Sequence, residues 1–329
     1  MEMLEGVKKG VLLKNYSTIK IGGRAKFFKE VKNLKELKEA IKWAKINNLP
    51  FFILGNGSNV LFPDNGFKGL VIKIKNEKVI KIKKNSLVLG AGYLLNNLVQ
   101  LSVKKGYKNF EWLNGIPGTI GGAVYGNAGA FGFEMKDIVL KVKTINPENL
   151  KEKIYLNKDC QFSYRESIFK KNKEIIWEVE VIKKKGNKKE IKEKSFNYLK
   201  TRIDKNMFSY PSLGSIFKNV LILETPYKKF FNPKKEEVII KGEKVKALQG
   251  KVSAGWFIEK CKLKGKVKGG AKISDFHANI IINFKNAKAK DVLYLINLIK
   301  KKVFQVFKIK LKEEIVILKN FSELYPKNT

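Results

Sequence analysis

The sequence predicts an α+β protein of two domains. Its 329 residues correspond to about two domains of ordinary size. Helical and strand periodicities are mixed along the chain, without the regular βαβ alternation of a doubly wound sheet. A lysine-rich helical segment gives way to a Ser/Pro/Gly turn at residues 202–208, where we place the main boundary. We therefore predict one domain over residues 1–202 and a second over residues 203–329.

The first elements expected are one helix and several short strands. Apolar residues at helical spacing in 33–48 predict an amphipathic helix, and Asn33, three residues before a glutamate, resembles the start of a capping box. Residues 51–55 predict a short buried strand that leads into a polar turn. Segments 71–75 and 79–83 both read VIKIK, and their strict alternation predicts half-exposed strands.

The remaining elements follow in the order strands, charged connection, helix and strand. Residues 138–184 are rich in strand patterns, with apolar residues alternating with glutamates near Trp177. Residues 183–194 are a charged connection, either a hairpin tip or the start of an exposed helix. Residues 289–307 carry an apolar stripe typical of an amphipathic helix, and residues 309–318 predict a final strand.

The net charge is high but does not by itself indicate a nucleic-acid-binding protein. The chain carries 68 Lys and Arg against 30 Asp and Glu, a formal charge of +38, with 44% hydrophobic residues. That apolar content is unlike a disordered polyelectrolyte. Only Arg24, Arg165 and Arg202 are arginines, although arginine is the side chain best suited to phosphates and base edges. Because the lysines are dispersed, we interpret them as a solvated surface.

Few side chains are available for metal binding or histidine-based catalysis. Cys160 and Cys261 fit a reducing compartment and form no CxxC pair, and His277 is the only histidine. We therefore predict no metal site and no Ser/His/Asp triad. The N-terminus lacks the apolar core of a signal peptide, and the longest charge-free run, 112–133, holds seven glycines, unlike a membrane helix. We expect a cytoplasmic protein without membrane contacts, a monomer or a weak oligomer.

A polar turn at residues 55–59 is the first candidate binding segment. Two glycines let its backbone approach an anion, and Ser58 and Asn59 add donors. Successive backbone N–H groups in such a turn form a nest for a phosphate. The turn matches neither a Rossmann fingerprint nor a Walker loop, so a dinucleotide would be bound in another way. The alternative is a purely structural turn.

A second candidate segment, residues 115–132, contains seven glycines interleaved with apolar residues. This composition costs conformational entropy on folding, so it indicates either a tightly packed loop or backbone that surrounds a flat, extended cofactor. We favour the cofactor, because two glycine-rich turns suggest one long ligand with a diphosphate in its middle.

Three further segments carry single candidate side chains. Arg165, in CQFSYRES, suits a bidentate carboxylate or a structural ion pair. Ser215 lies in a tight turn, LGSIFKN, that presents a hydroxyl, although most such turns are not catalytic. Glu313 and Glu314 are adjacent in the last expected strand, and because alternate residues face opposite sides, at most one points into a site.

Together these segments resemble the UDP-N-acetylenolpyruvoylglucosamine reductase family, also called UDP-N-acetylmuramate dehydrogenases. The matching stretches occur in the family's order between residues 15 and 318. They are NYSTIKIGGRAKFF, ILGNGSNVLFPDNGFKGLVI, EWLNGIPGTIGGAVYGNAGAFGFE, CQFSYRESIFK, LGSIFKN, SAGWFIEKCKLKG, GGAKISDFHANIIIN and KEEIVIL.

The resemblance implies an FAD-binding fold of the vanillyl-alcohol-oxidase type, in two lobes over roughly 1–77 and 78–202, followed by a smaller α+β substrate-binding domain. It implies that NADPH reduces non-covalently bound FAD, which then reduces UDP-N-acetylglucosamine enolpyruvate to UDP-N-acetylmuramate. This reaction belongs to peptidoglycan synthesis, and so to cell-wall biogenesis, cell shape and cell division. The expected partner is a UDP-sugar and not a specific nucleic acid.

The resemblance also implies roles for residues of this sequence. The family's serine proton donor falls on Ser215, its arginine on Arg165, and its glutamate on Glu314, with Glu313 as the alternative. The implied flavin contacts are Gly55, Asn56, Gly57, Ser58, Asn59, Gly115, Ile116, Pro117, Gly118, Thr119, Gly121 and Gly122. The implied UDP-sugar contacts are Tyr164, Lys205, Asn219 and His277, although His277 would otherwise be a satisfied core histidine.

Two other functions and the family subtype stay open at this stage. The alternatives are another flavin-dependent oxidase or dehydrogenase of the same fold, and a basic nucleic-acid-binding protein. The family divides by a tyrosine loop that covers the substrate. The segment after Lys170 has no clear equivalent of that loop, while residues 220–252 are longer than in the compact subtype.

Overall fold

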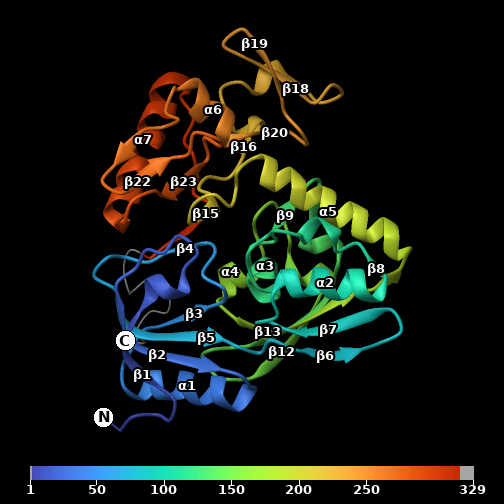
Figure 1. Cartoon of the computed structure of the whole chain (residues 1–329), viewed down its shortest axis with the longest axis vertical. Helices are drawn as coiled ribbons and strands as arrows, with labels where there is room; N and C mark the ends of the chain where they lie inside the picture. The colour runs from blue at the N-terminus through green and yellow to red at the C-terminus, as the bar shows by residue number, and fades with distance from the viewer. Residues whose placement is uncertain (1, 319–329) are drawn as a thin grey trace.

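The computed structural model describes residues 2–318, and Figure 1 shows two lobes below a C-terminal domain. In the first lobe, α1 (Leu34–Ile46) packs on a sheet of order β1-β2-β5-β3. Its strands are β1 (Lys8–Leu12), β2 (Arg24–Val31), β3 (Phe51–Leu54) and β5 (Phe67–Ile74). Strands β2 and β3 both run parallel to β5, and β1 is antiparallel to β2. The α+β fold class is therefore confirmed.

The helix expected at 33–48 is confirmed as α1. The Asn33 side chain accepts a hydrogen bond from the Glu36 N–H (2.9 Å), as an N-cap does. The Glu36 carboxylate reaches back one residue further than in a standard capping box, to the N–H of Lys32 (2.6 Å). The strand expected after the helix is also confirmed, as β3.

The prediction of a half-exposed strand at residues 71–75 is wrong. This segment lies within β5, the third strand in the sheet order, and both Val71 and Ile72 are fully buried. Because α1 covers one face and further apolar residues cover the other, alternation with lysine does not mean solvent on one side. The second VIKIK copy forms β6 (Val79–Ile82), an edge strand that is more exposed than the half-exposed strand predicted, since Ile80 and Ile82 are both exposed.

The second lobe is an antiparallel sheet of order β12-β11-β13-β7-β6. Its other strands are β7 (Ser86–Gly90), β11 (Val139–Ile145), β12 (Glu152–Leu156) and β13 (Ile175–Ile182), which confirms the strand-rich stretch. Three helices cover it: α2 (Leu95–Lys105), α3 (Ile120–Tyr125) and α5 (Lys188–Asp204). The charged connection thus contains the start of an exposed helix, α5. The shorter elements here are β8 (Tyr107–Lys108), β9 (Gly129–Ala130), β10 (Phe133–Glu134), α4 (Phe169–Asn172) and β14 (Lys184–Lys185).

The buried core of the C-terminal domain also takes in Ile19, Ile21 and Leu61 of the first lobe. Its antiparallel sheet has the order β15-β23-β22-β21, and α6 (Ala254–Lys260) and α7 (Ala289–Phe307) pack with it. Helix α7 has the bounds that the apolar stripe predicted. The sheet strands are β15 (Ser212–Ser215), β21 (Val267–Lys268), β22 (Ala271–Ile273) and β23 (Ile280–Asn283).

A separate small sheet occupies much of residues 220–252, the segment that we expected to be longer than in the compact subtype. It projects at the top of Figure 1. Its strands are β17 (Phe231–Asn232), β18 (Glu237–Ile240) and β19 (Glu243–Lys246), and the pair β16 (Val220–Leu221) and β20 (Lys251–Val252) closes its base.

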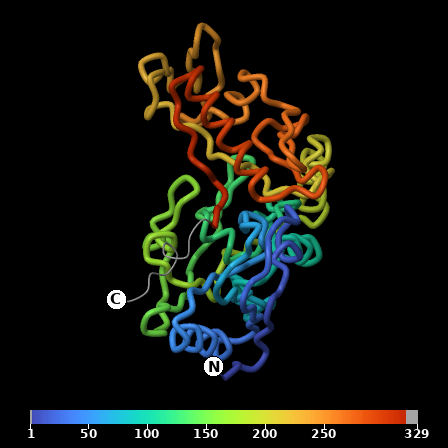
Figure 2. The backbone as a smooth tube through the Cα atoms, turned by 90° about the vertical axis from the view of Figure 1, so that its left-hand side faces the viewer, coloured from blue at the N-terminus to red at the C-terminus, as the bar shows by residue number. Residues whose placement is uncertain are grey.

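The final strand is much shorter than predicted. Of residues 309–318, the strand proper is β24 (Val316–Ile317), which pairs in parallel with β4 (Val60–Leu61) of the first lobe. The backbone N–H of Glu314 donates to Ile216 (2.8 Å), whereas that of Val316 donates to Asn59 (2.9 Å). Because the partners belong to different segments, no long ladder forms. Figure 2 shows this red segment returning from the C-terminal domain to the lobes.

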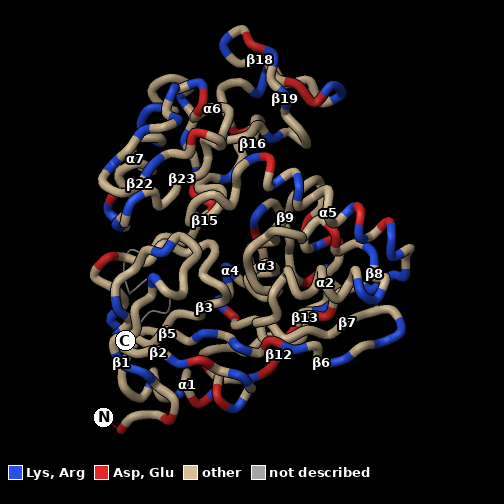
Figure 3. Tube along the Cα trace, viewed as in Figure 1, with Lys and Arg blue, Asp and Glu red and all other residues tan. Residues whose placement is uncertain are grey.

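Charged residues are dispersed over the fold. Figure 3 shows lysine and arginine on both lobes and on the C-terminal domain, interrupted by acidic residues, rather than in one continuous tract. Many of the acidic residues pair with these lysines, as Glu152 does with Lys38 and Lys143 (both 2.8 Å). The arrangement agrees with the interpretation of the lysines as a solvated surface.

Candidate active site

A cavity of about 610 Å³ takes its wall from both lobes and from the C-terminal domain. Residues around the end of β3 and in the 115–131 segment form much of the wall. Arg165 and Lys170 enter from the second lobe, and Ser215 enters from the C-terminal domain. The volume lies in the range of sites that bury most of a cofactor-sized ligand.

Both predicted glycine-rich segments line this cavity. The lining members are Gly55, Ser58, Asn59, Gly115, Ile116, Pro117, Gly118, Thr119, Gly121 and Gly122. Two residues of the first turn, Asn56 and Gly57, do not line it. The two segments meet, because a Cβ added at Gly55 would lie 2.8 Å from the Thr119 hydroxyl oxygen. Thr119 in turn caps α3 by accepting from the Gly122 N–H (3.2 Å).

Gly57 shapes the first turn without reaching the cavity. Its φ is +64°, and a Cβ there would lie 1.9 Å from the Tyr16 carbonyl oxygen. The Gly57 carbonyl accepts a hydrogen bond from the Thr18 N–H (3.2 Å). A lysine that sequence analysis did not single out supports the same turn: Lys73 Nζ donates to the Gly55 carbonyl (2.8 Å), and burial lowers the pKa of Lys73.

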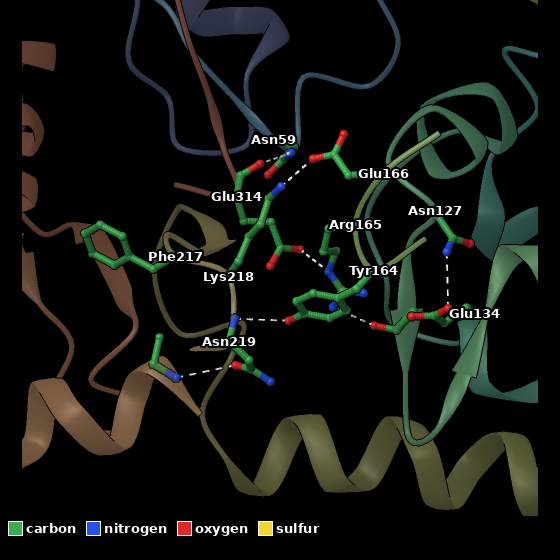
Figure 4. A network of polar contacts seen from close by, with 12 residues as sticks. Asn59, Asn127, Glu134, Tyr164, Arg165, Glu166, Phe217, Lys218, Asn219 and Glu314 are labelled. Carbon is green, nitrogen blue, oxygen red and sulfur yellow. Dashed lines mark hydrogen bonds and ion pairs between the residues drawn. The ribbon is translucent and has the colours of Figure 1, made fainter. Parts of the chain in front are cut away.

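Arg165 lies in a tight turn between Ser163 and Glu166, with a φ of +58°. Its Nε donates to Glu314 Oε1 (2.6 Å), and its Nη2 donates to the Gly129 carbonyl (3.0 Å). Figure 4 shows the guanidinium reaching Glu314 across the boundary between the second lobe and the C-terminal return segment. The sequence suggested that the Arg165 guanidinium could bind one carboxylate with two hydrogen bonds. In the structure it binds the Glu314 carboxylate through Nε and the Gly129 carbonyl through Nη2.

The two adjacent glutamates point to different partners, as strand alternation predicted. Glu314 lines the cavity and binds Arg165, whereas Glu313 pairs with Lys300 of α7 (2.9 Å). The backbone carbonyl of Glu314 also accepts a hydrogen bond from Asn59 Nδ2 (3.1 Å), which ties it to the glycine turn (Figure 4).

Ser215 is half-buried and lines the cavity at the end of β15. The ladder between β15 and β23 shifts register between Ser212 and Ser215, so the strand bulges there. Bulges redirect side chains at the edge of a sheet. The preceding residue, Gly214, has a φ of +71°. Ser215, Arg165 and Glu314 thus all line the cavity, and the backbone N–H of Glu314 donates to the carbonyl of Ile216, the residue after Ser215 (2.8 Å).

The residues predicted to contact a UDP-sugar are divided. Lys205 lines the cavity, whereas Tyr164, Asn219 and His277 do not. Tyr164 and Asn219 contact each other, since the Asn219 N–H donates to the Tyr164 hydroxyl (3.0 Å). The Tyr164 ring lies beside Arg165, and Lys251 Nζ lies 4.5 Å from its centroid. Tyr164 and Asn219 thus lie next to Arg165 without lining the cavity.

His277 is partly buried in the C-terminal domain. Its Nδ1 accepts a hydrogen bond from the Asn279 N–H (3.3 Å). Burial lowers the pKa of His277, and the nearby Lys205 lowers it further. Asn279 then holds Phe217, two residues from Ser215, through hydrogen bonds to its backbone N–H and carbonyl.

A cluster around Glu166 was missed by sequence analysis. Glu166 pairs with Lys218 of the C-terminal domain (2.5 Å) and with Lys170 (3.6 Å), and Lys170 donates to the Arg165 carbonyl (2.5 Å). Burial acts to raise the pKa of Glu166, but the two lysines outweigh it and the pKa falls. Burial, opposed by Glu166, lowers the pKa of Lys170. The spacing of Glu166 and Lys170, four residues apart, was the signal available.

Arg202, noted before only at the domain boundary, supports the second glycine-rich segment. Its guanidinium donates to the carbonyls of Asn114 (2.7 Å) and Trp112 (3.2 Å), directly before Gly115. Burial lowers the pKa of Arg202 to about 10.

At another part of the cavity wall, the buried Glu174 accepts hydrogen bonds from Tyr155 (3.0 Å) and Thr144.

The described residues hold neither a metal-binding cluster nor a helix that could span a membrane. Among residues 2–318, His, Cys, Asp and Glu form no group of three or more that is arranged to hold a metal ion. Across the same residues, every helix is too short or too polar to span a bilayer.

Comparison with known proteins assigns both halves of the chain. A family model described as the C-terminal domain of UDP-N-acetylenolpyruvoylglucosamine reductase matches residues 206–318. A second model, described as an FAD binding domain, matches residues 25–149.

Whole-chain relatives agree with these matches. The chain is 36% identical over 307 residues to the UDP-N-acetylenolpyruvoylglucosamine reductase of Alkaliphilus oremlandii, covering 93% of this chain and 91% of that protein. It is 36% identical over 307 residues to that of Carboxydothermus hydrogenoformans, covering 93% and 92%. The crystal structure of UDP-N-acetylenolpyruvylglucosamine reductase from Thermus caldophilus superimposes with a TM-score of 0.74 at 31% identity, covering 94% of this chain and 98% of that chain. The chain belongs to the UDP-N-acetylenolpyruvoylglucosamine reductase family.

Proposed function

We propose that this protein uses FAD and NADPH to reduce UDP-N-acetylglucosamine enolpyruvate to UDP-N-acetylmuramate, a step of peptidoglycan precursor synthesis. Family membership supports the reaction. The observation that supports assigning it to particular residues is that Ser215, Arg165 and Glu314 all line the cavity that both glycine-rich segments also line. The three side chains come from segments that are far apart in the sequence.

The cavity residues fit FAD. Glycine at 55 and 121 lets the segments of the wall pack closely, since a Cβ would lie 2.8 Å from the Thr119 hydroxyl oxygen at Gly55 and 2.8 Å from the Ala91 Cβ at Gly121. The 55–59 turn would hold the diphosphate with backbone N–H groups, while the apolar side chains of Ile53, Ile116 and Ile176 would pack on flat rings. When bound, FAD accepts hydride from NADPH and delivers it to the enolpyruvyl double bond.

Arg165 binds and polarises the carboxylate end of the substrate, and Glu314 holds Arg165 in place. Hydride addition to the β-carbon builds negative charge on the α-carbon and its carboxylate. A guanidinium fixed at that place stabilises the charge as it develops. Glu314 orients Arg165 through its Nε (2.6 Å), and Gly129 orients it through Nη2, so little reorganisation is needed during the reaction.

Ser215 supplies the proton to the α-carbon. A hydroxyl is a weak acid, but a carbanion-like centre is basic enough to take its proton. The bulge in β15 and the positive φ of Gly214 support this role, because the Ser215 that they precede lines the same cavity as Arg165.

The UDP-sugar diphosphate and sugar lie outside the Arg165 wall, on the C-terminal domain. Lys205 lines the cavity, and Asn219 of the C-terminal domain forms a hydrogen-bonded pair with Tyr164, whose ring lies beside Arg165. We propose residues 1–202 as the FAD-binding domain and 203–329 as the substrate-binding domain. The free thiols Cys160 and Cys261 suit a cytoplasmic location, and we propose a monomer or weak oligomer there.

The test is anaerobic spectroscopy of the purified protein. Bound flavin should give a yellow spectrum that NADPH bleaches and that UDP-N-acetylglucosamine enolpyruvate then restores, with one UDP-N-acetylmuramate formed per flavin. Rapid reoxidation by oxygen with no response to the enolpyruvyl nucleotide would contradict the proposal and indicate another flavin oxidase. Colourless protein that binds DNA with a steep salt dependence would also contradict it.

A further inference from the structure

A loop of the first lobe caps a helix of the C-terminal domain. The loop joins β4 to β5, and its Asp64 carboxylate accepts hydrogen bonds from the backbone N–H groups of Ala289 (2.7 Å) and Lys290 (3.2 Å). These are the first two residues of α7. We propose that Asp64 is a positioning residue that fixes the angle between the two domains and so keeps Ser215 at the cavity; the proposal rests on the function proposed above.

The loop that presents Asp64 is rigidly packed. Gly23 and Gly66 both donate backbone hydrogen bonds to the Pro63 carbonyl (3.0 Å each). A Cβ at Gly23 would lie 2.2 Å from the Asp64 carbonyl oxygen, and one at Gly66, where φ is +78°, would lie 1.9 Å from the Arg24 carbonyl oxygen. Two family-matching stretches, IGGR and PDNG, are thus explained by this close packing and not by the cavity.

The start of α7 needs such an acceptor. The first N–H groups of a helix have no partner within the helix, and a carboxylate there also meets the positive end of the helix dipole. Asp291 accepts from the Lys288 N–H (3.0 Å) within the C-terminal domain. Asp64 of the first lobe accepts hydrogen bonds from the next two N–H groups, so residues of both domains cap the helix.

The position of helix α7 determines the position of Ser215 through the packing between them. It packs against β21 and β22, whose sheet continues through β23 to β15. Val292 and Ile296 of α7 belong to the same buried cluster as Ile281 of β23 and Ile216, the residue after Ser215. Because a close-packed core deforms little, a rotation of α7 moves β15 with it.

Neighbouring contacts define the same boundary. The Thr18 hydroxyl donates to the Ser212 carbonyl (2.7 Å), and Asn283 Nδ2 donates to the Ile19 carbonyl (2.9 Å). In Figure 1, β4 lies directly beneath the C-terminal domain. Among these boundary contacts Asp64 holds the domain through two charge-assisted hydrogen bonds, and it does not line the cavity.

The experiment compares Asp64→Ala and Asp64→Asn with Asn33→Ala in the full holoenzyme. Asn33→Ala removes an N-cap that lies within one lobe, so it has a similar expected effect on stability without touching the boundary. Spin labels on Lys42→Cys in α1, away from the N-cap that the control removes, and on Lys301→Cys in α7, in a Cys261→Ser background, report the distance between the domains. Stopped-flow absorbance reports reoxidation of NADPH-reduced flavin by the enolpyruvyl substrate.

We expect Asp64→Ala to broaden the distance distribution and to slow reoxidation about tenfold, at unchanged flavin content. Asp64→Asn keeps an acceptor and should stay within about threefold of the unaltered protein, and Asn33→Ala should change neither readout. An unaltered distance distribution in Asp64→Ala, or a reoxidation rate equal to that of Asn33→Ala, overturns the proposal. Failure of the unaltered holoenzyme to react with the substrate would instead overturn the proposed function, while the distances would still report on the role of Asp64.

Discussion

Arg165 combines an unusual backbone with a well-held side chain. A φ of +58° is rare for a residue with a Cβ and persists only where the surroundings impose it. Here the surroundings include Glu314, the Gly129 carbonyl and Lys170, which donates to the Arg165 carbonyl. At the residue scale, the site is therefore organised around Arg165, which its neighbours fix through hydrogen bonds to both its side chain and its backbone.

Replacement of Arg165 by lysine should lower kcat about 100-fold or more, because lysine keeps the charge but loses the planar fork that binds Glu314 and Gly129 together. Steady-state kinetics with the enolpyruvyl substrate would measure this. Arg24→Lys is the matched control, since Arg24 donates to the Gly10 carbonyl at an exposed place away from the cavity. Near-normal kinetics for Arg165→Lys would make Arg165 a structural residue.

Ser215→Ala should retain bound flavin and its reduction by NADPH, yet lose about 100-fold or more of the turnover with the enolpyruvyl substrate, because the proton donor is gone. Separate anaerobic measurements of the two half-reactions would show the difference. Ser209→Ala, which removes an exposed hydroxyl bonded to Asn206, should behave as the unaltered protein. Full turnover in Ser215→Ala would refute the assignment.

His277 should make stability depend on pH. Burial and Lys205 lower its pKa in the folded protein, so as the pH falls below about 6.5 the unfolded chain binds the proton more readily than the folded one. This contribution to stability is complete above that pH and is lost as the pH falls. The thermal midpoint should therefore drop more between pH 7.5 and 5.5 in the unaltered protein than in His277→Gln. Equal drops would show that His277 does not carry the effect.

The sequence motifs pointed to some candidate side chains, such as Ser215 and Glu314. They did not point to the residues that support these side chains. Lys73 and Lys170 are two lysines among many in this sequence, and composition cannot distinguish a half-buried lysine from a solvated one. Their environment depends on tertiary packing, which places Lys73 on the Gly55 carbonyl and Lys170 beside Glu166.

The turn after β3 shows how an element is shaped by a residue outside the cavity. Gly57 is buried and does not line the cavity, yet its positive φ and its approach to Tyr16 set the path of the backbone. The conformation of the whole turn, and so the direction of its N–H groups, depends on the absence of a side chain there.

Gly57→Ala should therefore lower the FAD content of purified protein about tenfold or more, because the Cβ would meet the Tyr16 carbonyl at 1.9 Å and displace the turn. Absorbance at 280 and about 450 nm gives the flavin ratio. The control is Gly242→Ala, where φ is +82° but nothing lies within 4 Å. It should cost about 1 kcal/mol of stability and keep its flavin. Normal flavin content in Gly57→Ala would contradict this account.

Elements with a long, regular pattern were predicted well. Helices α1 and α7 follow from apolar spacing alone, whereas α3 was not expected, since it contains two glycines and depends on the Thr119 cap and on packing against β7 and β13. The buried VIKIK copy and its exposed copy have the same sequence, so only their position in a sheet separates them. The division into domains at residue 202 stays a prediction.

At the scale of the whole molecule, the excess of lysine produces self-repulsion. A formal charge of +38 disfavours the compact state at low ionic strength, although many lysines find acidic partners. Salt screens such repulsion over distances longer than an ion pair.

The thermal midpoint should accordingly rise by about 3 °C or more between 20 and 300 mM NaCl. Calorimetry of the holoenzyme would measure it, and tetramethylammonium chloride at equal ionic strength should produce the same rise, which separates screening from specific sodium binding. A constant or falling midpoint would mean that ion pairs already balance the surface charge.

The segment that returns from α7 to β4 has a consequence for biosynthesis. A ribosome adds Glu314 after nearly every other residue that lines the cavity, since among the lining residues in the described range 2–318 only Val316 comes later. Most of the cavity-forming chain is thus synthesised before the carboxylate that binds Arg165. A nascent chain stalled near residue 300 still lacks that carboxylate and is chemically unfinished.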